Sequence, residues 1–181
     1  MMKYTLQNIR NQFQKKQRIK FLFFWGHTAK SEITKSCFSQ WFTGRFEENG
    51  IVYKTAEHYM MAGKARLFDD PETLEKILLS ATPNQAKSLG RKVKNFDPKH
   101  WDEHKYEIVK QGNLLKFSQN KKFGDFLLST NDKILVEASP YDSIWGIGML
   151  ETDSRAENPL LWNGENLLGF ALMEVRDELR R

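Results

Sequence analysis

Residues 53–65 combine opposite charges with small and flexible apolar side chains. Glu57 and Lys64 are seven residues apart, so on a helix they share one face and lie about 10 Å from each other. Met60 and Met61 lie between or beside them, and Gly63 leaves room. Such a face could bracket a sugar phosphate. The alternative, which we favour from this segment alone, is a boundary helix whose charges reach solvent past a methionine core.

Residues 135–148 form the second polar stretch. A strand would deliver Glu137 to its end, and the following loop would present Asp142 and Trp145. Loops at strand ends are where binding residues concentrate, and the pair Gly146 and Gly148 would let backbone approach a ligand closely. A tight turn with a packed indole explains the same residues equally well.

Isolated residues elsewhere add weaker signals. Trp101, near a helix start, could stack on a planar base or could begin an apolar stripe of that helix. Basic side chains at Arg91 and Lys116 suit phosphate oxygens, and Asn166 suits a ribose or base edge. Each of these three could equally be surface charge or a helix cap.

Motifs for nucleotides and metals are weak or missing. Gly146 and Gly148 lack the third glycine of the dinucleotide fingerprint, and the sequence has no phosphate loop of the Gly-Lys-Ser type. His100 and His104 have metal-ligand spacing on a helix, but Trp101 stands where a zinc protease needs glutamate. We favour a solvated first turn there, and we expect no metal and no cofactor.

Composition places the chain among globular proteins with one domain. It has 181 residues, of which 40% are hydrophobic and 28% charged, and its 13% of aromatic residues argues against disorder. No apolar stretch approaches the roughly 20 residues of a membrane span, and the start has no secretory h-region. The one cysteine, Cys37, excludes an internal disulfide and favours the reducing cytoplasm.

The positive charge is concentrated at the N-terminus. The net charge is +5, yet residues 1–20 carry six basic side chains and no acid, so residues 21–181 are close to neutral. Leu6, Ile9 and Phe13 have helical spacing. A basic arm could meet nucleic acid or another anionic surface. We favour a helix docked by its apolar stripe, with the lysines in water.

The remaining chain predicts an α+β domain that is rich in helix and has a small β-sheet. Strands are expected at 21–25 and 133–138, and shorter extended pieces at 37–42 and 46–53, the latter with a turn at Asn49-Gly50. Asp-Pro or Thr-Pro pairs mark three helix starts. Helices are expected at 55–68, 70–79, 82–94, 97–119, 121–128 and 165–181, and a loop at 139–148.

Taken in order, these segments resemble the NADAR family, also called YbiA-like. The resemblance covers about 21–179 and is carried by Glu57-His-Tyr-Met-Met-Ala-Gly-Lys64-Ala65, by Trp145-Gly-Ile-Gly148, and by Trp162-Asn-Gly-Glu-Asn166-Leu-Leu-Gly169. One departure is Gln40, where asparagine is expected more often. The resemblance implies a YbiA-like fold over 21–181, with 1–20 as a separate basic arm.

The resemblance also implies an N-glycosidase that cleaves the base–ribose bond of phosphoribosylamino-pyrimidine intermediates of riboflavin synthesis. It implies Glu57, Asp142 and Trp101 as catalytic residues. Substrate contacts are expected from Lys64, Arg91, Lys116, Trp145, Gly146, Gly148 and Asn166.

Two alternatives stay open. One is a hydrolase that removes ADP-ribose from modified guanine in nucleic acid, with the basic arm positioning that substrate. The other is a module that binds ADP-ribose or a nucleotide without cleaving it. The sequence leaves the roles of the two carboxylates and the oligomeric state undecided.

Overall fold

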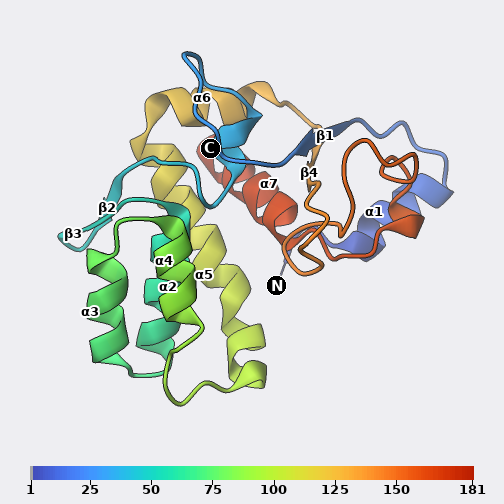
Figure 1. The fold of residues 1–181 in the computed structure, drawn as a ribbon. Helices are drawn as coiled ribbons and strands as arrows, with labels where there is room; N and C mark the ends of the chain where they lie inside the picture. The colour runs from blue at the N-terminus through green and yellow to red at the C-terminus, as the bar shows by residue number, and fades with distance from the viewer. Residues whose placement is uncertain (1) are drawn as a thin grey trace.

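The computed structural model describes residues 2–181, and its C-terminal helix runs through the middle of the fold (Figure 1). The α+β fold expected from the sequence is confirmed. The helices are α1 (Leu6–Gln14), α2 (Ala56–Leu67), α3 (Pro71–Leu79), α4 (Pro83–Gly90), α5 (Pro98–Gln119), α6 (Lys121–Ser129) and α7 (Leu167–Leu179), with short 3₁₀-helices η1 (Lys35–Phe38) and η2 (Pro159–Leu161). The strands are β1 (Phe21–Phe24), β2 (Phe46–Glu48), β3 (Ile51–Tyr53) and β4 (Ile134–Glu137).

The strands form two separate pairs. β1 and β4 are parallel, and Phe24 lies opposite Glu137 at their carboxyl ends. β2 and β3 form an antiparallel hairpin. Asn49 and Gly50 form its turn with φ values of 52° and 79°, as a two-residue turn of type I′ requires. The turn expected at Asn49-Gly50 is therefore confirmed.

Four helix starts follow the capping residues in the sequence. The side chains of Thr55, Asp70, Thr82 and Asp97 each accept a hydrogen bond from a backbone N–H of the first turn. The expected extent of the third of these helices is wrong, because α4 ends at Gly90 and not near Lys94. The chain turns there so that the Lys94 N–H donates to the Asp70 carboxylate, which ties the segment to the start of α3.

Residues 37–42 are not the extended piece that the sequence suggested. The Cys37 N–H donates to the Thr34 carbonyl, and the chain forms η1 followed by bends. This conformation is stabilised from α5, since the Lys116 Nζ donates to the carbonyls of Cys37 and Ser39 at 2.8 Å each. A contact with a residue about eighty positions away cannot be inferred from local pattern.

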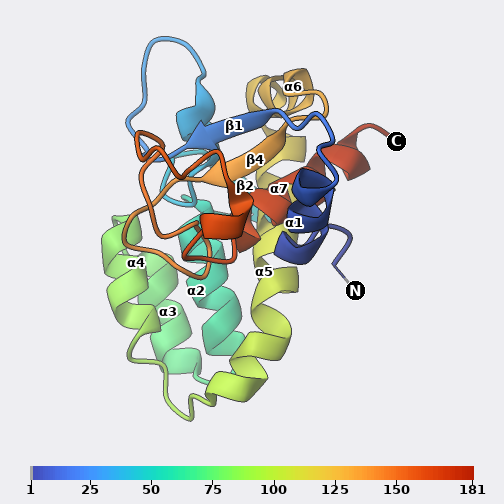
Figure 2. The ribbon, with the colours of Figure 1, turned by 90° about the vertical axis from the view of Figure 1, so that its right-hand side faces the viewer.

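The C-terminal helix α7 is buried over most of its length. Every residue of α7 from Leu167 to Arg176 is buried. The helix packs against β4, α5 and α6, and Figure 2 shows it running beneath β4. Helices α2, α3 and α4 form a separate group on the other side of α5 (Figure 1). Within the described residues no helix is long and apolar enough to cross a membrane.

Helix α1 packs onto the body of the protein by its apolar side. Ile9 is fully buried, and the Arg10 Nε donates to the Pro159 carbonyl in η2 at 3.0 Å. The Tyr4 hydroxyl donates to Asp177 on α7. This arrangement agrees with the docked helix that we favoured. The division into an arm at 1–20 and a domain at 21–181 stays a prediction. Residue 1 of that arm lies outside the described residues.

Candidate active site

A cavity of about 500 Å³ opens where the carboxyl ends of β1 and β4 meet the first turn of α2. Three carboxylates line it, namely Glu57, Glu137 and Asp142. Its aromatic walls come from Trp25, Trp41, Tyr141 and Trp145, and its one lysine is Lys87 on α4. The remaining lining consists of Gly26, His27, Ser39, Gln40, Met60, Met61 and Ser139. The cavity therefore combines acid groups with flat apolar surfaces and one cation.

Glu57 is held at the start of α2. The Thr55 side chain caps the helix, and the Glu57 N–H donates to the Gln40 carbonyl at 2.9 Å. The Glu57 side chain is 5% exposed. Burial raises the pKa of Glu57 to about 7, against the attraction of the nearby Lys87 cation. A carboxyl group with a pKa near neutrality can exchange protons during a reaction.

Glu137 is delivered by the end of β4. Its N–H donates to the Asn166 Oδ1 at 2.9 Å, and Asn166 also donates to the Leu135 carbonyl. The Glu137 Oε2 is shielded from solvent and has no hydrogen-bond partner within the described residues. Burial, followed by the negative charges of Asp142 and Glu57, raises the pKa of Glu137 to about 8. At neutral pH this side chain is mostly a protonated acid.

Asp142 lies in the loop after β4 with its orientation fixed by backbone. Its Oδ1 accepts hydrogen bonds from the N–H groups of Ile144 and Trp145 at 2.9 and 2.7 Å. The hydrogen bonds that shape this turn use Oδ1 and leave Oδ2 of Asp142 outside them. Asp142 can thus face a ligand without losing the contacts that shape its loop.

Gly146 and Gly148 shape this loop and are not among the cavity-lining residues. A Cβ at Gly146 would lie 2.8 Å from the Glu137 carbonyl oxygen. Gly148 has φ of +66°, and its N–H donates to the Asp142 carbonyl. The predicted contact residue Asn166 is fully buried and acts on β4 through the hydrogen bonds described above. These three residues position Glu137 and Asp142.

The remaining candidates lie apart from the cavity lining. The Lys64 Nζ lies 3.9 Å from the ring centroid of Phe96 and 5.6 Å from that of Trp101. Lys116 is fully buried under η1. Arg91 is not part of the lining, but its charge is among the influences that lower the pKa of Glu57. The structure thus brings Glu57, Asp142 and Trp145 together, and the roles assigned to all ten residues stay predictions.

Sequence reasoning missed several residues of the cavity. Glu137 was placed at a strand end but not proposed as a functional residue, although an acid leaving a buried strand is the signal that could have found it. Lys87 lies four residues before Arg91, so both point to one side of α4. Trp25 and His27 could not be assigned, because the pairing of β1 with β4 was not predicted.

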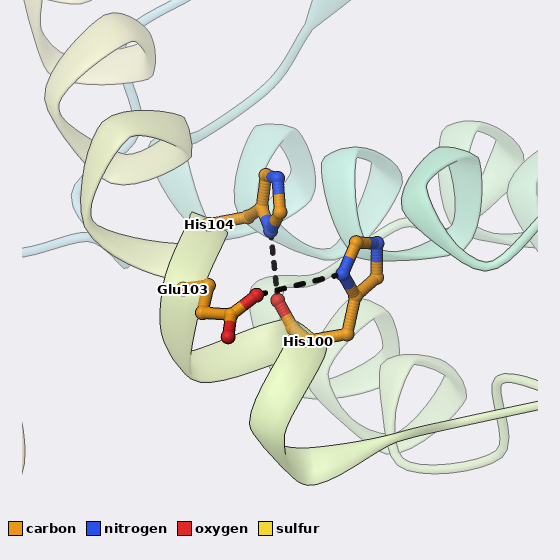
Figure 3. Close-up of side chains that lie close together, drawn as sticks. All are labelled: His100, Glu103 and His104. Carbon is orange, nitrogen blue, oxygen red and sulfur yellow. Dashed lines mark hydrogen bonds and ion pairs between the residues drawn. The ribbon is translucent and has the colours of Figure 1, made fainter.

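A group of residues with metal-ligating atoms lies elsewhere, on the first turns of α5 (Figure 3). Ligand atoms of His100, Glu103 and His104 lie within 4.8 Å of one another. The cluster is the one such group of at least three His, Cys, Asp or Glu side chains found within 2–181. The cavity itself is not a preformed metal centre of this kind.

Comparison with known proteins establishes the family. The NADAR domain model matches residues 23–180, and this chain belongs to that family. It is 46% identical over 164 residues to "N-glycosidase R617" of Acanthamoeba polyphaga mimivirus, covering 88% of this chain and 96% of the relative. It is 32% identical to "Riboflavin biosynthesis protein PYRR, chloroplastic" of Zea mays, covering 74% of this chain but 21% of that longer protein.

The solved structure of the Escherichia coli protein YbiA shares the fold, with a TM-score of 0.71 and 26% identity over 91% of this chain and 87% of YbiA. The family resemblance inferred from the sequence is confirmed. The expected enzyme class, a hydrolase acting on N-glycosyl bonds, is confirmed by relatives named N-glycosidases at 30–46% identity.

Proposed function

We propose that this chain hydrolyses the base–ribose bond of phosphoribosylamino-pyrimidine intermediates of riboflavin synthesis. The observation that carries the proposal is the convergence of Glu57, Glu137 and Asp142 in one cavity with aromatic walls. The name of the maize relative supports the riboflavin setting. Cys37 is a buried free thiol and the one cysteine of the sequence, which fits a protein of the reducing cytoplasm.

Cleavage of this bond builds positive charge on the ribose, as in an oxocarbenium ion. An ionised carboxylate beside C1′ stabilises that charge and accepts a proton from the attacking water. Glu57 and Asp142 are the two candidates for this role, and the other would hold the ribose hydroxyls. The C1′–N bond breaks, the C1′–O bond to the water oxygen forms, and ribose phosphate and the amine are released as two separate products.

The departing nitrogen needs a proton, and Glu137 is suited to supply it. Its raised pKa keeps it protonated at neutral pH, and its Oε2 has no competing partner in the described structure. Lys87 offers a cation for the phosphate, while the Trp41 and Trp145 rings offer flat surfaces for the base. All groups in this scheme come from the chain itself.

The test is hydrolysis by purified protein of two substrates in parallel, the phosphoribosylaminopyrimidine and DNA with ADP-ribosylated guanine. Release of ribose phosphate is expected, with at least a hundredfold loss in Glu57→Gln. Glu75→Gln, which changes an exposed carboxylate on α3, serves as the matched control and should retain full turnover. ADP-ribose release alone would replace the proposal with the guanine hydrolase. Ligand binding without turnover of either substrate would indicate a binding module.

A further inference from the structure

The cluster of His100, Glu103 and His104 lies at a distance from the cavity. His100 packs edge-on against Phe68, with ring centroids 5.8 Å apart. Phe68 follows the end of α2, eleven residues after Glu57, which corresponds to about 16 Å along a helix. The cluster therefore lies near the end of α2 opposite the carboxylates, and none of its three members lines the cavity.

One imidazole of the cluster contacts the backbone. The His104 Nδ1 lies 2.8 Å from the His100 carbonyl oxygen (Figure 3). A carbonyl can only accept, so Nδ1 carries the proton, while Nε2 lies on the far side of the ring from Glu103 (Figure 3). An ion held by all three side chains therefore requires the His104 ring to turn and give up this hydrogen bond.

The other two side chains complete a set of three donors. The two imidazole rings have centroids 4.4 Å apart, and the Glu103 Oε2 lies 4.0 Å from the His100 Nδ1. The side chains of His100 and Glu103 are 46% and 55% exposed, so a hydrated ion can reach them. Two nitrogens and one carboxylate oxygen are a donor set that Zn²⁺ and Ni²⁺ accept, with water filling the remaining positions.

Other soft ligands in the chain are poor competitors. Both ring nitrogens of His58 are engaged, by Thr55 and by the Ser80 carbonyl, and Cys37 is buried. His27 is the remaining histidine and lies 5.4 Å from Trp41 in the cavity. A metal ion could therefore bind imidazole either at the cluster or at His27, and variants at these positions distinguish the two.

We propose that His100, Glu103 and His104 form a surface site for a divalent transition metal, with Zn²⁺ as the ion of best fit. The ion binds imidazole nitrogens and the Glu103 carboxylate. The start of α5 carries the positive end of the helix dipole, and three protein ligands are fewer than structural zinc sites use. The site is thus an exchangeable one.

The test is calorimetric titration of the full chain, freed of metal and carrying no polyhistidine tag, with ZnCl₂ at pH 7.5. One site is expected. His100→Ala and His104→Ala should each weaken binding at least tenfold, about 1.4 kcal/mol, and Glu103→Gln should weaken it less. His27→Ala and Asp142→Asn are the matched controls and should bind as the original chain does.

A second readout is the thermal midpoint, which zinc should raise in the original chain and in His27→Ala but not in His104→Ala. Equal midpoints of all variants without metal would show that the fold is intact. Zinc affinity unchanged in His100→Ala and His104→Ala, or lost in His27→Ala, would overturn the proposal. The absence of any zinc heat and any midpoint shift would overturn it as well.

Discussion

Replacement of Glu137 by glutamine should change how the stability of the protein depends on pH. Burial and the charges of Asp142 and Glu57 raise the pKa of Glu137 from an ordinary 4.5 to about 8, with Lys87 opposing them. Between these two values the folded chain holds a proton that the unfolded chain has released. The free energy of unfolding must therefore fall as the pH rises across this interval.

The size of this effect follows from the two pKa values. One pH unit corresponds to about 1.4 kcal/mol, so the interval gives an upper limit of about 5 kcal/mol, and about 3 kcal/mol is reached by pH 7. Glutamine cannot ionise, so the variant lacks this contribution. Typical domains have 5–15 kcal/mol in total, which makes the difference easy to measure.

The assay is urea unfolding of both proteins at intervals from pH 5 to pH 9. Near pH 5 the two should have similar stability, because Glu137 is protonated in the folded chain. Above pH 5 the original chain should lose stability relative to Glu137→Gln, and the difference should level off above pH 8. Parallel curves over the whole range would show that Glu137 is not a buried acid with a raised pKa.

Three further outcomes are expected. Burial lowers the pKa of Lys116 to about 7, so between pH 7 and 10.5 the folded chain binds fewer protons at this side chain than the unfolded chain does. In the same urea assay, the stability of the original chain should therefore rise relative to that of Lys116→Met across this range. Equal slopes of stability against pH for the two proteins would contradict this. Asn166→Ala leaves the Glu137 N–H and the Leu135 carbonyl without their partner, and should cost about 2–4 kcal/mol in urea unfolding, whereas the exposed Asn163→Ala should cost little. Tyr141→Ala removes a ring that is 89% exposed and whose centroid lies 6.2 Å from that of Trp25. KM should therefore rise roughly fivefold or more with kcat retained, whereas Tyr141→Phe keeps the ring and should keep the KM. A loss of kcat in Tyr141→Ala would place the ring in the chemical step.

Local signals in the sequence predicted most helix starts, because the capping side chains act within three residues. Thr82 and Gln85 form the capping box that their spacing indicated. The Asn49-Gly50 turn followed from the φ values that those residues tolerate. By contrast, η1 is stabilised by Lys116 across the core, and α7 is buried by α5, α6 and β4, which lie earlier in the chain. Such contacts leave no local pattern.

The candidate site was predictable in part for the same reason. Glu57, Asp142 and Trp145 stand in the two polar stretches that drew attention in the sequence, and the structure brings them to one cavity. Lys64 shares a helix face with Glu57, and Trp101 stands near the start of another helix, yet Lys64 extends toward Phe96. Spacing along one helix tells which side chains are neighbours, but not which of two ends of that helix faces the ligand.

The parallel pairing of β1 with β4 has a consequence for how the protein acquires its activity. Phe21 pairs with Ile134, so the strands that meet at the cavity are more than one hundred residues apart in the chain. Contacts of such sequence separation form late, because a long loop must close before any hydrogen bond compensates for it. Glu137 is further fixed by Asn166, near the C-terminus. During synthesis the helical segment from α2 to α6 can collapse first, and the enzyme should become active only after α7 has left the ribosome and packed beneath β4.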